Sequence, residues 1–161
     1  MIDKKNNESV YLKKSNKRFL IISNTSKYLY HYRSLLLSQL KTNFKELFII
    51  APEDNYSNFL INYGYFINSN LSSNSNNNPF NLIKSLYSLF ISIKNIKPDI
   101  VHSHTLKPNL LVSIINLIFG INTVISFPGL GKLSTSKGLK LFLLKIILRT
   151  IYFSSIYLLF L

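Results

Sequence analysis

Short apolar runs alternate with helix-like segments along most of the chain. Between the runs, apolar residues recur at helical spacing, as in Leu35, Leu36 and Leu40, and the residues Pro79, Pro108 and Gly120 mark helix boundaries. The runs have the mostly apolar, β-branched character of strands that are buried on both faces: Phe19–Ile22, Leu47–Ala51, Tyr65–Ile67, Asp99–His102 and Thr123–Ser126. This alternation predicts right-handed crossovers and a parallel sheet, so we expect one Rossmann-like α/β domain with helices on both faces.

The two ends of the chain differ from this pattern. Residues 1–17 are polar and contain no apolar stretch long enough for a signal peptide, which predicts a disordered leader before an α/β domain over residues 18–152. The stretch 139–161 is apolar nearly all round but contains Lys145 and Arg149, which favours a covered helix over a membrane span. Its last part, residues 153–161, is interpreted as an apolar tail.

A second apolar stretch, residues 110–127, also has the composition of a membrane span. Asn116, Gly120 and Asn122 interrupt it, and a spanning helix needs about 20 continuous apolar residues. We therefore expect a helix, a turn and a strand here.

Composition narrows the function classes. The chain has 161 residues, of which 47% are hydrophobic, so it contains enough apolar material for one folded core and too much for a disordered protein. It has no Cys, which excludes disulfides and thiolate chemistry, and its three His are scattered. The net charge of +13 predicts an anionic partner. Nucleic acid is the weakest candidate, because the basic residues follow no known reading motif.

Three of the predicted strands end in unusually polar segments. These are residues 23–33, 102–109 and 127–132, which supply hydroxyls, imidazoles, cations and glycine amides. Because ligands bind beyond the carboxyl ends of parallel strands, we expect the three segments to converge on one rim that suits a polar anionic ligand. None of the three carries a carboxylate, which argues against two-carboxylate hydrolysis and against a Ser-His-Asp triad.

Each candidate in these segments also has a structural interpretation. The pair Asn24 and Thr25 would equally serve as a helix cap. His102 is expected to be a satisfied core histidine, whereas His104 lies past the expected strand end and is the one acid/base group by type. Lys107 has the wrong charge for a helix start, which favours ligand binding. The remaining candidates, Gly129 and Gly131, would otherwise supply turn conformations only.

The same segments carry a resemblance to a known family. The run Pro98–Asn109 reads PDIVHSHTLKPN, Gly129–Gly131 reads GLG, and Asn24-Thr25-Ser26 with Tyr32-Arg33 matches in register. The sequence resembles the N-terminal domain of family-four glycosyltransferases of the GT-B fold, and most of all those that build bacterial lipopolysaccharide, O-antigen and capsule. It departs from them in lacking a glycine-rich first loop, in Pro128 and Lys132 around the GLG segment, and in the apolar tail, which looks aberrant.

The resemblance implies transfer of a hexosyl-type sugar with retention at the anomeric carbon. The co-substrate would be a nucleotide-sugar donor with no further cofactor or metal, and the acceptor a glycan or a polyprenyl-diphosphate-linked glycan. His104 would be the catalytic candidate, and the acceptor or phosphate would be held by Asn24, Thr25, Arg33, Thr105, Lys107, Asn109, Gly129 and Gly131.

The resemblance also implies that a C-terminal donor domain is missing, so that the chain is truncated and inactive alone. Its expected place is the cytoplasm, at the inner face of the membrane. The alternative is a non-catalytic module that binds anionic membrane lipid or a lipid-linked glycan.

Overall fold

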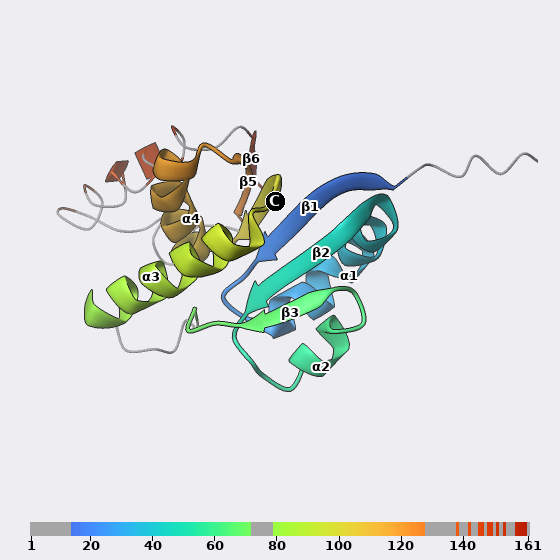
Figure 1. Ribbon diagram of the computed structural model, residues 1–161. Coiled ribbons are helices and arrows are strands. Elements are labelled where there is room, and N and C mark those ends of the chain that lie inside the picture. The colour runs from blue at the N-terminus through green and yellow to red at the C-terminus, as the bar shows by residue number, and fades with distance from the viewer. Residues whose placement is uncertain are drawn as a thin grey trace, which may run out of the picture.

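The computed structural model describes residues 14–71 and 79–127, together with residues 138, 142, 145, 146, 148, 149, 151, 153 and 157–160. Strands and helices alternate along these residues as predicted (Figure 1). The strands are β1 (Ser15–Ile22), β2 (Phe44–Ala51), β3 (Tyr65–Asn68), β4 (Ile100–His104), β5 (Asn122–Phe127) and β6 (Tyr157–Phe160). The helices are α1 (Ser26–Asn43), α2 (Ser57–Leu60), α3 (Pro79–Ile96) and α4 (Leu106–Phe119).

All six strands form one parallel sheet in the order β3-β2-β1-β4-β5-β6. β1 is central and pairs with β2 on one side and with β4 on the other, for example through Ile22↔Ile50 and Ile22↔Ser103. The strand order therefore reverses between β1 and β4. This arrangement confirms the predicted Rossmann-like α/β fold.

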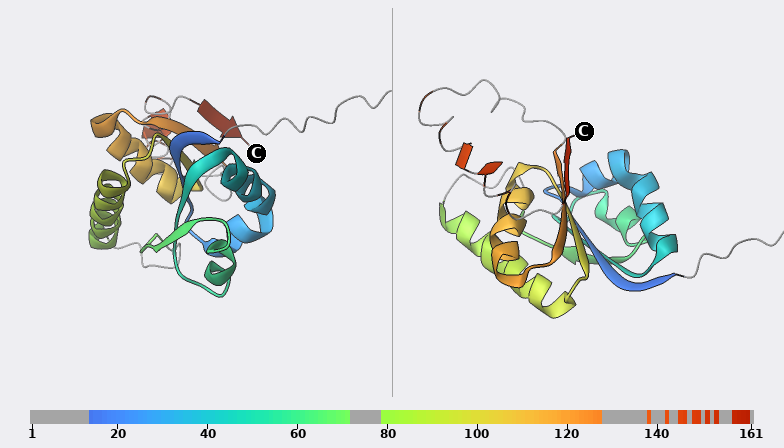
Figure 2. Two further views of the ribbon diagram at one scale, coloured as in Figure 1. Left: turned by 45° about the vertical axis from the view of Figure 1, so that its right-hand side comes forward. Right: turned by 90° about the horizontal axis from the view of Figure 1, so that it is seen from above.

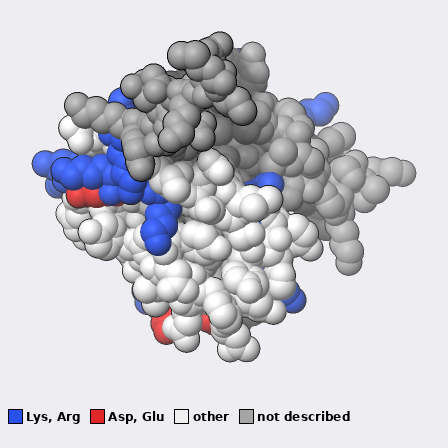
Figure 3. All heavy atoms as spheres, turned by 90° about the vertical axis from the view of Figure 1, so that its right-hand side faces the viewer, with Lys and Arg blue, Asp and Glu red and all other residues white. Residues whose placement is uncertain are grey.

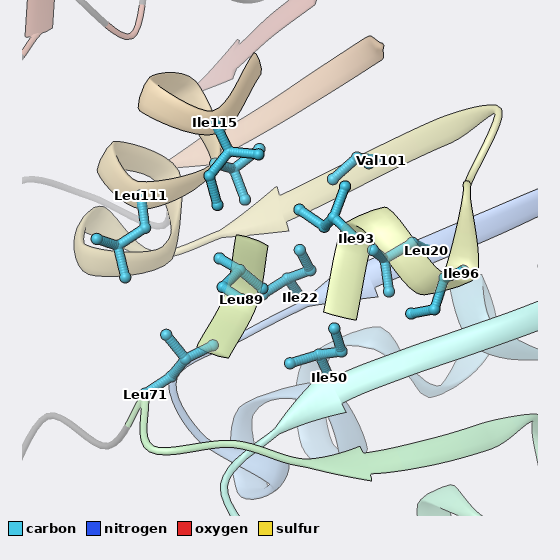
Figure 4. Packing of buried hydrophobic residues seen from close by; sticks show 11 residues of the cluster. Leu20, Ile22, Ile50, Leu71, Leu89, Ile93, Ile96, Val101, Leu111 and Ile115 are labelled. Carbon is cyan, nitrogen blue, oxygen red and sulfur yellow. The ribbon is translucent and has the colours of Figure 1, made fainter. Parts of the chain in front are cut away.

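Helices cover both faces of the sheet, with α1 and α2 on one side and α3 and α4 on the other (Figure 2). Side chains of β1 alternate between the two layers: Phe19 and Ile21 pack on the α1/α2 side, and Leu20 and Ile22 on the α3/α4 side. Figure 4 shows the second of these cores, where residues of α3 and α4 close over β1, β2 and β4. Burial of each such side chain contributes about 1.5–3 kcal/mol to folding.

Local sequence explains the helix boundaries. Thr25 begins α1 because its Oγ1 accepts a hydrogen bond from the backbone N–H of Tyr28 at 3.0 Å. Gly120 ends α4 in the left-handed conformation, with φ of +61°. The apolar stretch 110–127 is thus the larger part of α4, a glycine turn and β5, as expected. In the part of the chain that the structure describes, no helix has both the length and the apolar character needed to cross a membrane.

Two expectations at the ends of the chain are wrong. β1 begins at Ser15, so residues 15–17 belong to the sheet and not to a leader; residues 1–13 lie outside the described part. The expected helix does not reach the C-terminal end, because Tyr157–Phe160 form β6 and pair with β5. The free edge of β5 offers backbone N–H and C=O groups to pair, and these outweigh the helical pattern of the preceding residues.

Candidate functional site

The polar segments after β1 and β4 meet at the point where the strand order reverses. α1 leaves β1 toward one face of the sheet, and α4 leaves β4 toward the other. In parallel sheets, this divergence opens a crevice at the carboxyl ends of the two strands, and ligands bind there. The rings of Tyr28, from α1, and His104, from β4, lie 5.6 Å apart, so the first two of the three predicted segments converge. The third segment, apart from Phe127 at the end of β5, lies outside the described residues.

His104 is the last residue of β4 and not, as predicted, a residue beyond the strand. It is completely buried, and neither ring nitrogen has a hydrogen-bond partner among the described residues. Burial lowers its pKa to about 2, and the neighbouring His102 and Arg33 act in the same direction. The ring is therefore neutral at physiological pH, so it can donate one N–H and accept at the other nitrogen.

His102 forms the floor beneath His104. The two rings lie 4.2 Å apart, and His102 Nε2 shares a hydrogen bond of 2.7 Å with Ser126 Oγ of β5. Burial, assisted by Arg33, lowers the pKa of His102 to about 4. This confirms the prediction that His102 is a satisfied core histidine.

Arg33 brings positive charge to the site from the second turn of α1. Its Nη2 donates to Tyr28 Oη at 2.7 Å, and its guanidinium carbon lies 5.4 Å from the centre of the Tyr28 ring. Its Nε is buried without a partner in the described part of the chain. The guanidinium is thus held in place on one side and leaves a donor unused on the other.

The link from β4 to α4 contains strained and unsatisfied groups. Thr105 has φ of +72°, a conformation that costs a non-glycine residue about 1–3 kcal/mol, and its Oγ1 is buried without a partner among the described residues. Asn109 is buried, and its Nδ2 donates to Ser126 O at 3.0 Å. Asn109 therefore holds α4 to β5 and keeps only its Oδ1 unpaired in this part of the structure, which is a more structural role than predicted.

The structure gives the remaining candidates less specific roles in the site. Thr25 serves as the cap of α1, the simpler of its two interpretations, and Asn24 beside it is half-buried. Lys107 is half-buried in the first turn of α4, and burial lowers its pKa below the usual range. Gly129 and Gly131 lie outside the described residues.

Sequence reasoning did not single out Tyr28, Ser103 or Ser126. Tyr28 contacts both Arg33 and His104, and Ser126 holds both His102 and Asn109. Tyr28 belongs to the first polar segment, which was a usable signal. Ser126 was predicted only as part of a strand, and its role follows from the pairing of His104 with Ser126 in the sheet.

The site is characterised by buried polar atoms that lack a partner. In the described residues these are Arg33 Nε, Ser103 Oγ, both ring nitrogens of His104, Thr105 Oγ1 and Asn109 Oδ1. Each such atom costs about 1–3 kcal/mol, and native structures contain few of them. Their concentration at one end of two adjacent strands indicates a site that a hydroxyl-bearing or anionic ligand completes. The described residues contain no cluster of His, Asp or Glu that would hold a metal ion.

Known proteins resemble this chain in fold and, more distantly, in sequence. MurG of Acinetobacter baumannii superposes with a TM-score of 0.59 at 12% identity, over 89% of this chain and 41% of that one. A glycosyltransferase of Rickettsia africae superposes with a TM-score of 0.57 at 13% identity, over 90% of this chain and 42% of that one. These likenesses show the fold.

The sequence comparisons go further. The chain is 29% identical over 92 residues to the N,N'-diacetylbacillosaminyl-diphospho-undecaprenol alpha-1,3-N-acetylgalactosaminyltransferase of Campylobacter jejuni; the match covers 57% of this chain and 24% of that protein. The chain thus spans less than half the length of these proteins. A family model described as glycosyl transferase 4-like matches residues 18–158. The chain belongs to the glycosyl transferase 4-like family, and its sheet is the Rossmann-like half of a GT-B fold.

Proposed function

We propose that the chain is the acceptor-binding half of a retaining glycosyltransferase in cell-surface polysaccharide or lipopolysaccharide synthesis. Its co-substrate would be a nucleotide-sugar, and its acceptor a polyprenyl-diphosphate-linked glycan, as the name of the Campylobacter jejuni relative suggests. The observation that carries the proposal is the group of unpartnered buried polar atoms around His104 and Arg33. A site this rich in hydrogen-bonding groups suits hydroxyls and phosphate oxygens.

The electrostatics of the site indicate how its residues would act. Arg33 supplies a charge that is held by Tyr28 and has an unused N–H, which suits a diphosphate. The neutral ring of His104 would hydrogen-bond a sugar hydroxyl and fix its position. With a pKa of about 2, His104 is not protonated at neutral pH and does not serve as a general acid in the ligand-free site.

The chemistry can proceed without a protein base in this half. The anomeric C–O bond to the donor phosphate breaks, the acceptor hydroxyl oxygen bonds to that carbon, and the hydroxyl proton passes to the departing phosphate oxygen. Among the described residues, the titratable and charged groups that shift the pKa of His104 are His102 and Arg33, neither of which is a carboxylate. In this scheme the residues of the chain orient the acceptor, and a separate donor-binding domain supplies the nucleotide contacts.

A binding titration tests the proposal. The chain would be titrated calorimetrically with farnesyl-diphosphate-linked N-acetylglucosamine and with inorganic pyrophosphate. We expect Arg33→Gln to lower the affinity for both ligands at least tenfold, because the site loses its charge-assisted hydrogen bonds. Arg18→Gln, a matched change at the opposite edge of the sheet, should leave both affinities within twofold.

Transfer itself is tested by adding a donor-binding half as a separate chain. The C-terminal half of the Campylobacter jejuni relative, supplied as a separate chain with its nucleotide-sugar, should give sugar transfer that depends on His104 and Arg33. A folded chain that binds neither diphosphate ligand would contradict the proposal.

A second function, non-catalytic docking on anionic lipid, has its own support. Phe80, Ile83 and Tyr87 are exposed along one stripe of α3, with Lys84 beside them. The net charge of +13 would draw this face to an anionic surface at the cytoplasmic side of a membrane. Flotation with phosphatidylglycerol vesicles tests it: Tyr87→Asp should reduce binding several-fold, whereas Tyr65→Asp on β3 should not.

A further inference from the structure

A second hollow lies on the same edge of the sheet as His104, beyond β2 and β3. It encloses about 470 Å³, and its described lining is polar apart from Pro52: Glu53, Asn68, Ser69, Asn70, Asn81 and Lys84. Strands are about 4.8 Å apart, and three spacings separate β4 from β3, so this hollow is roughly 14 Å from the site at His104. A single sugar does not span such a distance, but an oligosaccharide does.

The lining of the hollow supplies both hydrogen-bond donors and acceptors. Glu53 and Asn68 form a reciprocal pair, in which Glu53 N donates to Asn68 Oδ1 at 3.1 Å and Asn68 Nδ2 donates to Glu53 Oε2 at 3.0 Å. This pair is fixed in position, and the carboxylate can accept further bonds at Oε1. Ser69 Oγ is buried without a partner in the described residues. A hydroxyl group, which donates and accepts at once, matches this mixture.

The charges of the hollow favour a neutral ligand. Glu53 and Lys84 contribute one charge of each sign, so the lining is neutral on balance, in contrast to the cationic site at Arg33. The described lining has no aromatic ring and no aliphatic side chain besides Pro52, which does not suit a lipid tail. A polyhydroxylated, uncharged molecule fits both observations.

The hollow is firmly connected to the rest of the rim. Ser69 N donates to Ala51 O at 3.1 Å, and Ser85 Oγ donates to Asn70 O at 2.9 Å, which joins β2, the end of β3 and α3. On its other side, Ser26 Oγ donates to Pro52 O at 2.6 Å and ties the hollow to the start of α1. The hollow and the His104 site are therefore parts of one rigid rim.

We propose that this hollow is a subsite for the neutral sugars of the acceptor glycan that do not react, held there while the reacting hydroxyl lies at His104. The inference rests on the proposed function and extends it, because it makes Glu53, Asn68 and Ser69 determinants of acceptor length. An acceptor long enough to reach from one site to the other gains affinity from both, whereas a shorter acceptor occupies only one.

Direct binding to the chain tests the subsite. Saturation-transfer NMR and calorimetry would compare two neutral trisaccharides, chitotriose and maltotriose, with their monosaccharides. We expect at least one trisaccharide to bind at least fivefold more tightly than its monosaccharide. Asn68→Ala and Lys84→Gln should each abolish most of this gain, and Asn58→Ala, an exposed amide on α2, should not. Lys84 lies on the surface of α3, so its replacement reports on the subsite even if Asn68→Ala perturbs β3.

The outcomes separate the subsite from the proposed function. Equal binding of trisaccharides and monosaccharides, or trisaccharide binding that is indifferent to both variants, overturns the subsite. Pyrophosphate binding that depends on Arg33 is measured in the same samples and reports on the main site alone. If the trisaccharide binds through Asn68 but pyrophosphate does not bind, the hollow is a sugar site and the diphosphate acceptor is wrong.

Discussion

The two edges of the parallel sheet differ in how fully their polar side chains are hydrogen-bonded. At the amino edge, Arg18 donates from Nε to Glu46 Oε2 at 2.8 Å and from Nη1 to Ile96 O at 2.9 Å, and its backbone N–H is bound by Asp99. At the carboxyl edge, Arg33 and His104 bury nitrogens without partners in the described residues. The polar groups of Arg18 at the amino edge are therefore used within the fold, whereas the carboxyl edge keeps hydrogen-bonding groups that the described residues do not use.

The surface shows the same contrast. Figure 3 views the molecule from the side on which β1 begins, and there Lys and Arg side chains gather next to carboxylates, while most of the other described surface is uncharged. Charges that face solvent next to an opposite charge contribute little to stability. At the other edge, the half-buried Arg33 brings positive charge to the site, with its Nε buried.

The largest effect that the comparison predicts is a loss of stability in acid. His102 and His104 stay neutral in the fold, with pKa values lowered to about 4 and about 2, whereas the unfolded chain takes up protons near the ordinary value of 6.5. The stability is complete above pH 6.5 and is lost as the pH falls toward 4, because the unfolded state binds more protons. Urea unfolding at pH 7.5 and pH 5 should differ by on the order of 4 kcal/mol.

Variants of single histidines show which residue causes the loss of stability in acid. His104→Phe should remove about half of the difference between the two pH values, because one of the two buried histidines is gone. His31→Gln should retain the whole difference, since His31 is exposed on α1. A difference that is unchanged in His104→Phe would show that the carboxyl edge is not the source of the acid sensitivity.

The next largest effect is expected at the amino edge, where Gly64 lies against β2. Gly64 lies just before β3, and a Cβ on it would collide with the carbonyl oxygen of Leu47 in β2. Gly64→Ala should therefore displace the start of β3 and lower the free energy of unfolding by about 2–3 kcal/mol. Chemical denaturation measures this. Gly120 lies at a turn with open space around it, so Gly120→Ala is unfavourable only because of the positive φ. It should lower the free energy of unfolding by less, about 1 kcal/mol.

A smaller loss is expected from the partnered arginine. Arg18→Ala removes the bonds to Glu46 and to Ile96 O, but the side chain is 45% exposed, so water replaces much of what is lost. We expect a decrease of about 1 kcal/mol in the free energy of unfolding and no change in pyrophosphate affinity. A loss of pyrophosphate binding in this variant would mean that the two edges are not separate in function.

The smallest change in stability is expected at the carboxyl edge itself. His104→Phe replaces two unpartnered nitrogens by apolar atoms of similar shape between Tyr28 and His102. At pH 7.5 the free energy of unfolding should stay within about 1 kcal/mol of the wild type or increase, while acceptor binding falls at least tenfold. Binding that survives, together with a stability loss of several kcal/mol, would make His104 a structural residue.

The sequence predicted most of the fold because its strands are buried on both faces. Runs such as Phe19–Ile22 and Leu47–Ala51 are typical of strands in a covered parallel sheet, and Pro79 and Gly120 mark the start of α3 and the end of α4 as predicted. The prediction that Pro108 opens its helix is wrong by two residues, because α4 begins at Leu106. β6 was not predicted, because its four residues, Tyr157–Phe160, continue the apolar composition of the segment that was predicted to be helical. Only the free edge of β5 decides their conformation.

The site was predictable in its place but not in its geometry. The polar ends of β1 and β4 indicated where ligands bind, and topology alone brings them together. The state of His104 was not predictable, because its burial depends on Tyr28 from another element. The positive φ of Thr105 and the hydrogen bonds of Ser126 likewise depend on tertiary contacts that leave no local pattern.

Ser126 joins the site to a neighbouring strand through two different atoms. Its hydroxyl binds the ring that supports His104, and its carbonyl oxygen holds the amide of Asn109 in α4. A small displacement of the end of β5 would therefore move the His102 ring and the Asn109 amide together. A molecule that displaces the end of β5 would therefore also displace the residues beneath the proposed acceptor site, although it touches neither His104 nor Arg33.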